Sequence, residues 1–151
     1  MANAHASTIG RADKVKIALL VIMVSAVPMY MLYGFCRDWI EQRLDASRGY
    51  ASTTVVGAAA RLRQMQEANV AFVGQVAHVS QLPPDRFVLV RYRMTCCAAD
   101  ATPVTVPVRW AGATSLKDGA WVKVFGKTDP AAKAVVADKV EATGEPSNPY
   151  L

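Results

Sequence analysis

The sequence predicts one membrane-spanning α-helix near the N-terminus, a helical stalk, and a small all-β domain folded as a five-stranded OB-like barrel. Three observations support this prediction: an uncharged apolar run at residues 17–35, an Ala-rich helical stretch at 37–69, and β-branched segments separated by turns from residue 70 onward. Hydrophobic residues make up 52% of the 151 residues and charged residues only 19%, which disfavours disorder and a fully solvated monomer. We therefore expect part of the apolar surface to lie in a membrane.

The apolar run is predicted to cross the membrane once, as an uncleaved anchor over residues 17–36. As a helix, the run is about 29 Å long, close to the hydrocarbon thickness of a bilayer. A cleaved signal peptide is disfavoured, because the run exceeds the usual apolar region of such peptides and no A-x-A-like site follows it. Tyr30, Tyr33 and Trp39 stand where interfacial aromatic residues are expected.

The orientation of the span follows from the basic residues beside it. Three basic residues precede the span and three follow within the next fifteen residues, so the count is a tie. Because the tail at residues 1–16 is short and Lys14 and Lys16 adjoin the span, we expect the N-terminus inside. The chain is then a single-pass protein of the cell membrane with an extracytoplasmic, periplasmic C-terminal domain.

Residues 37–69 are predicted to form a stalk of one or two helices, interrupted at residues 47–49. Apolar residues recur at helical spacing in two groups. These are Trp39, Ile40 and Leu44, and then Val55, Val56, Ala59, Leu62 and Met65. The stalk either lies on the lipid surface or packs on the neighbouring domain or on a partner subunit.

Residues 70–151 are predicted to form the barrel. Five β-rich segments stand between turn signals. They are residues 71–79, 86–94, 104–110, 120–127 and 134–142. Their period-two alternation predicts an antiparallel sheet with one buried face that closes on itself, and Gly74 and Gly126 fall where a small barrel bends. The strand count favours an OB-like barrel and is also compatible with an SH3-like one.

The loop between the second and third segments carries the candidate chemistry. Cys96, Cys97 and Asp100 supply two thiols and a carboxylate, which are competent ligands for a soft or borderline cation such as zinc. A closed zinc site needs four ligands, and His78 is the candidate for a further one. Two alternatives stay open: one thiol packs in the barrel and the other has no role, or a strained or intermolecular disulfide forms.

Nucleic-acid binding and catalysis have no positive support in the sequence. The strands carry several basic residues, namely Arg86, Arg91, Arg93, Arg109 and Lys123. Residues 70–151 nevertheless contain nine basic and seven acidic residues, a net charge of only +2, so we interpret these residues as a solvated strand face and expect no nucleic-acid partner. No phosphate-binding loop, dinucleotide fingerprint, nucleophile elbow or paired-histidine motif is present, so we expect no enzymatic activity.

Three stretches resemble the C-terminal domain of bacterial permease accessory subunits: RFVLVRYRMTCCAADATPV (86–104), GAWVKVFGK (119–127) and EPSNPYL (145–151). These are membrane proteins of largely unknown function that sit beside a multi-spanning permease, and some are linked to zinc starvation. The resemblance implies an accessory role in transport, with Cys96, Cys97 and Asp100 as the family's signature. This chain departs from the family in having a single predicted span, whereas such subunits commonly have more.

The sequence therefore predicts a single-span, membrane-anchored accessory subunit of a permease-like complex. Its partners would be the lipid bilayer and other membrane protein subunits. A cation, zinc in the sharper form of the hypothesis, would be captured at the loop by Cys96, Cys97 and Asp100, with His78 as a possible addition. The alternative is a purely structural or assembly subunit of a larger membrane complex without metal chemistry.

Overall fold

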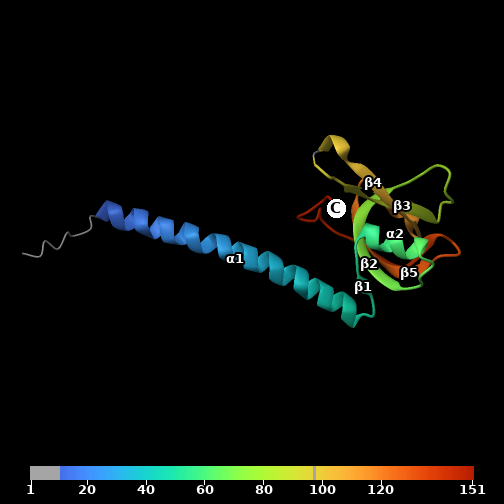
Figure 1. Ribbon diagram of the computed structural model, residues 1–151, viewed down its shortest axis with the longest axis horizontal. Coiled ribbons are helices and arrows are strands. Elements are labelled where there is room, and N and C mark those ends of the chain that lie inside the picture. The colour runs from blue at the N-terminus through green and yellow to red at the C-terminus, as the bar shows by residue number, and fades with distance from the viewer. Residues whose placement is uncertain (1–10, 97) are drawn as a thin grey trace, which may run out of the picture. The chain divides into compact units, whose positions relative to one another are not determined.

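A computed structural model describes residues 11–96 and 98–151. This part of the chain divides into two compact units, the first ending at Glu41 and the second comprising Gln42–Leu151. The first element is α1 (Arg11–Ser47), a long helix that contains Pro28 (Figure 1). It ends at Ser47, at the interruption that the sequence predicted for residues 47–49.

The N-terminal unit is an apolar helix. Within the described chain, one helical segment, Val15–Ser47, is long and apolar enough to cross a membrane. The side chains described between residues 15 and 41 are all exposed, so no described part of the protein covers them. A helix that is apolar on every side is stable only where its surroundings are apolar too.

The second unit is a closed barrel, which confirms the predicted OB-like fold. Its strands are β2 (Asn69–Ala77), β3 (Arg86–Arg93), β4 (Thr102–Arg109), β5 (Trp121–Asp129) and β6 (Ala134–Ala142), and short β1 (Ala51–Ser52) adds to its edge. The strand order is β1-β2-β3-β4-β6-β5, and pairing of β2 with β5 closes the ring. The short 3₁₀ helices η1 (Ala98–Asp100) and η2 (Ala113–Ser115) lie in the connections before and after β4.

The prediction of an antiparallel sheet was wrong at one pairing inside the barrel. β4 runs parallel to β6, through Val108 opposite Val135 and Arg109 opposite Val136. The reason is the odd number of strands. Neighbours in a closed ring can alternate in direction only if their number is even, so a ring of five must contain a parallel pair.

Helix α2 (Val55–Arg63) lies across the barrel strands (Figure 1). It begins after Thr54, whose side-chain oxygen accepts a hydrogen bond from the backbone N–H of Gly57, a regular N-cap. Val55, Ala58 and Ala59 from the helix are buried in the same apolar cluster as the strand residues. The segment that the sequence assigned to the stalk thus contributes a helix to the barrel core.

Both glycines that the sequence assigned to bends stand at close approaches. At Gly126 the pairing of β5 with β6 shifts register, and a side chain there would collide with the backbone of Val136 and Ala137. At Gly74 a Cβ atom would lie 3.3 Å from Val55 Cγ2. Glycine at these positions lets one strand bend and lets α2 pack closely against the other.

The end of α1 belongs to the barrel unit through polar and aromatic contacts. Asp45, only 2% exposed, pairs with Lys123 of β5 at 2.9 Å. Lys123 Nζ lies 5.3 Å from the ring centroid of Phe125, and Tyr50 meets the same ring edge-on at 5.5 Å. The Tyr50 hydroxyl also donates to Asp138 at 2.9 Å. Residues 45–50 therefore form part of this compact unit.

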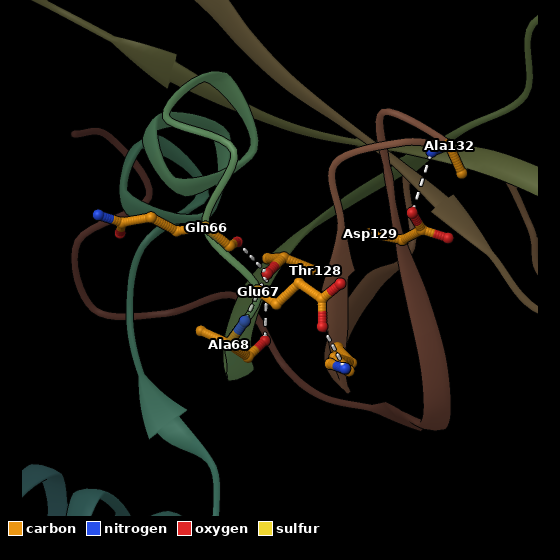
Figure 2. Close-up of polar contacts among 7 residues, drawn as sticks. Gln66, Glu67, Ala68, Thr128, Asp129 and Ala132 are labelled. Atoms are coloured by element: carbon orange, nitrogen blue, oxygen red, sulfur yellow. Dashed lines mark hydrogen bonds and ion pairs between the residues drawn. The ribbon is translucent and has the colours of Figure 1, made fainter.

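One buried hydroxyl fixes the connection between α2 and β2 to strand β5 (Figure 2). Thr128 is fully buried, and its Oγ1 donates to the carbonyl oxygen of Gln66 at 2.7 Å. The same Oγ1 accepts the backbone N–H of Ala68 at 2.7 Å. Close by, Asp129 Oδ1 accepts the N–H of Ala132 at 3.0 Å, which caps the turn from β5 to β6. Both connections are held by buried or partly buried hydrogen bonds.

Candidate functional site

The loop between β3 and β4 folds around the carboxylate of Asp100. Asp100 Oδ1 accepts the backbone N–H of Thr95 at 3.2 Å, and Oδ2 accepts that of Cys96 at 2.9 Å. The Cys96 side chain is exposed. Cys97, the second predicted thiol ligand, lies outside the described residues. The Asp100 carboxylate thus contacts the backbone of Cys96, whose thiol is exposed, and holds the loop closed.

His78 is held at the end of β2 by two acceptors. One ring nitrogen, Nδ1, lies 2.7 Å from Asp118 Oδ1, and the other, Nε2, lies 3.0 Å from the carbonyl oxygen of Ala113. Only the doubly protonated ring can donate both bonds, so they raise the pKa of His78, the Ala113 carbonyl being the main cause and Asp118 the second. A protonated ring nitrogen has no lone pair for a metal ion.

The structure does not bring His78 to the Cys-Cys loop. His78 follows Ala77, which pairs with Val88, whereas the loop begins after Arg93 at the other end of β3. Five strand residues at about 3.3 Å each place the two levels about 17 Å apart. Among the described residues, no group of three or more histidine, cysteine or acidic side chains could hold a metal ion. The described donors of the predicted site are therefore Cys96 and Asp100.

Arg91 is the organising residue that the sequence analysis missed. Its Nε donates to the carbonyl oxygen of Pro149 at 3.0 Å, and its Nη2 donates to those of Asn148 at 2.5 Å and Tyr150 at 3.2 Å. The guanidinium carbon also lies 5.4 Å from the ring centroid of Trp121. Burial lowers the pKa of Arg91, which is 9% exposed.

The interpretation of the strand cations as a solvated face was therefore wrong for Arg91, and Lys123 is also mostly covered, at 17% exposed. The alternation of side chains along β3 indicated this burial. Arg91 lies on the same face of the strand as Phe87 and Leu89, both of which are fully buried. A charged residue in register with two core residues indicates a buried polar contact.

The segment that Arg91 holds also pairs with β3. The backbone N–H of Leu151 donates to the carbonyl oxygen of Tyr92 at 2.9 Å, and Tyr150 forms a parallel bridge with Tyr92. We call this set, Arg91 and Tyr92 with Trp121 and residues 148–151, the tail clasp. It joins the three stretches, 86–104, 119–127 and 145–151, on which the family resemblance rests.

Comparison with known proteins identifies the family of the barrel domain. The family model of the DUF1980 C-terminal domain matches residues 53–151. No curated protein matches the chain.

Two solved structures are similar to the chain. A structure of yeast RPA bound to ssDNA is 8% identical, with a TM-score of 0.42, over 62% of this chain and 77% of that chain. The S. pombe Stn1–Ten1 complex is 21% identical, with a TM-score of 0.32, over 50% of this chain and 57% of that chain. Neither likeness bears on what this chain binds.

Replacing Arg91 tests the tail clasp. We expect Arg91→Ala to lower the free energy of unfolding by about 2–3 kcal/mol, because hydrogen bonds from a charged donor and buried packing are lost together. Residues 148–151 should also become accessible to carboxypeptidase. Arg93→Ala, an exposed position on the same strand, is the control and should cost less than about 0.5 kcal/mol. Equal stability of the two variants in urea denaturation would contradict the assignment.

The protonation of His78 is tested by an NMR titration of its ring. We expect a midpoint above the ordinary value of 6.5, and a lower midpoint in Asp118→Asn. Because the folded-state pKa is raised, the stabilisation from this contact is present below pH 6.5 and is lost as the pH rises through the raised pKa. The pKa of Asp118 is lowered, mainly by the hydrogen bond from the backbone N–H of His78 and next by the one from its ring. The stabilisation that Asp118 contributes is therefore lost only at acidic pH. A midpoint at or below 6.5 would show that the ring does not donate both bonds.

Proposed function

Because the chain belongs to the DUF1980 C-terminal domain family and carries a long apolar helix ahead of that domain, we propose that it is a membrane-anchored accessory subunit of a permease-like complex. The helix would cross the membrane once, and the barrel would face a partner membrane protein from the extracytoplasmic side. The proposal assigns the chain a role in assembly or delivery and no catalytic activity.

The observation that carries the proposal is the uncovered apolar surface of the first unit. The segment Val15–Ser47 has the length and composition of a membrane span, and its most apolar part is not buried within the described structure. A core helix of a soluble protein would be mostly covered. The barrel has its own apolar core and its own tail clasp, so it does not need the apolar helix to complete it.

Membrane anchoring and partner binding are tested in the same preparation. We expect the full chain to stay in the pellet after alkaline extraction of membranes, with its full length retained. Purification in mild detergent should recover a multi-spanning membrane protein in stoichiometric amount. Leu20→Arg with Val24→Arg should release the chain, since an arginine near the middle of a span, as at position 24, costs about 2.5–3.5 kcal/mol.

The matched control keeps the apolar character at the same positions, as Leu20→Ile with Val24→Leu, and should behave like the original chain. Loss of the first residues from the mature protein would instead identify the helix as a cleaved signal sequence. Recovery of the unmodified chain in the soluble fraction would contradict a membrane anchor. An anchored chain without a multi-spanning partner would contradict the accessory role alone.

A second candidate function is delivery of a cation from the Cys-Cys loop to that partner. It is favoured by the exposed Cys96 thiol, whose own backbone N–H contacts the Asp100 carboxylate. Cys96, Cys97 and Asp100 would hold a zinc ion, which would itself be the cargo passed to the partner and would not change its oxidation state. Three ligands leave one position open, which suits hand-over better than a closed structural site does. His78 has no part in this version of the proposal.

Zinc content and zinc titration of the purified full chain test the second candidate. We expect one zinc per chain, lost in Cys96→Ser and in Cys97→Ser. Cys36→Ser, which changes the cysteine of the apolar helix, is the matched control and should retain the metal. A folded chain that binds no zinc in any of these forms would favour an assembly subunit without metal chemistry.

A further inference from the structure

Two cavities border the side of α2 that faces β4. The first has a volume of about 380 Å³ and the second about 270 Å³. They share two lining residues, Ala59 and Arg63, and so adjoin along the helix; we call the two cavities together the α2 groove. The first volume is at the low end of the range typical of sites for small molecules, and the second is just below that range.

The α2 groove combines an apolar lining with positive charge. Leu62, Met65 and Pro107 line the first cavity. Arg63 borders both cavities, Lys133 borders the first and Arg93 the second. No acidic residue is among the described residues that line either cavity. A ligand that complements this groove therefore has an apolar body and a negative charge.

Backbone strain is concentrated at the same place. Among the described residues, two that are not glycine have a left-handed backbone: Met65 with φ 56° and Lys133 with φ 51°. Both line the first cavity. Glycine or asparagine would fit these turn positions with less strain, so a long side chain at each one points to a use for that side chain.

The two strained turns are held rigidly. Figure 2 shows Thr128 bonded to Gln66 and Ala68, just after Met65, and Asp129 bonded to Ala132, just before Lys133. The turns that carry Met65 and Lys133 are thus fixed to the same strand, β5. A groove whose walls are ordered before binding loses little conformational freedom when a ligand enters.

We propose that the α2 groove binds a small organic anion, an apolar body that carries a carboxylate. Arg63 and Lys133 contact the carboxylate, and Leu62, Met65 and Pro107 contact the apolar body. An added peptide strand is the less suitable occupant, because Pro103 and Pro107 of the adjacent strand have no N–H to offer it. This site goes beyond the proposed accessory function and does not depend on it.

The test uses the full chain in lipid nanodiscs, with empty nanodiscs to subtract partition into lipid. Ligand-observed NMR measures binding of 4-phenylbutyrate, its matched amine 4-phenylbutylamine, and acetate. We expect 4-phenylbutyrate to bind at least about tenfold more tightly than the other two, because only it supplies both a negative charge and an apolar body. Equal binding of the amine, or no binding of 4-phenylbutyrate above the blank, would overturn the proposal.

Variants locate the site and separate binding from folding. Arg63→Gln with Lys133→Gln should weaken 4-phenylbutyrate binding about tenfold or more, whereas Lys117→Gln, an exposed lysine outside the groove, should not change it. Lys133→Gly should weaken binding and raise the melting temperature, because it removes the charge and the strain together. Unchanged binding in the double variant, or a lower melting temperature in Lys133→Gly, would assign these residues a structural role instead.

Discussion

The contact between the guanidinium of Arg91 and the backbone of residues 148–150 is the interaction that fixes the C-terminal tail to the barrel. A buried charge is tolerated only when its donors are satisfied, and here carbonyl oxygens and the Trp121 ring do this. The tail in turn depends on β3, because in the described structure its one strand-like pairing is the bridge of Tyr150 with Tyr92. Barrel and tail therefore fold as one unit.

A second constraint is the odd number of strands. Closing five strands requires a parallel contact, and in this chain β4 and β6 make it over only two residue pairs. Helix α2 also contacts β4, and its Val55, Ala58 and Ala59 lie in the core. The helix thus compensates for a short seam in the sheet, and the α2 groove lies along that contact.

Local patterns in the sequence predicted the elements whose causes are local. The apolar run, the break at residues 47–49, the strands and the bend at Gly126 follow from periodicity, charge and glycine. The parallel seam and the burial of Arg91 were missed, because both depend on pairings between segments far apart in the chain. The position of Arg91 on the same strand face as Leu89 was the one local sign that Arg91 is buried.

The residues of the candidate metal site also differ in whether local sequence could place them. Asp100 and Cys96 are neighbours in one loop, so their proximity could be predicted from spacing. His78 could be placed only through the register of β2 with β3, which sets it at the opposite end of the strand pair. Its two hydrogen bonds to Asp118 and Ala113 depend on a third segment that periodicity does not place. The domain boundaries 1–16, 17–36, 37–69 and 70–151 stay predictions.

The hydrogen bonds of the tail clasp are made to the main chain of residues 148–151 and not to their side chains. The hydrogen bonds of Arg91 and Tyr92 with residues 148–151 use backbone carbonyl oxygens and a backbone N–H, groups that every residue offers except that proline has no N–H. Replacing the side chain of Asn148 or Tyr150 would consequently leave these main-chain contacts in place, provided that the extended path is kept. The contacts at this end of the molecule therefore depend on one arginine side chain and on the course of the backbone.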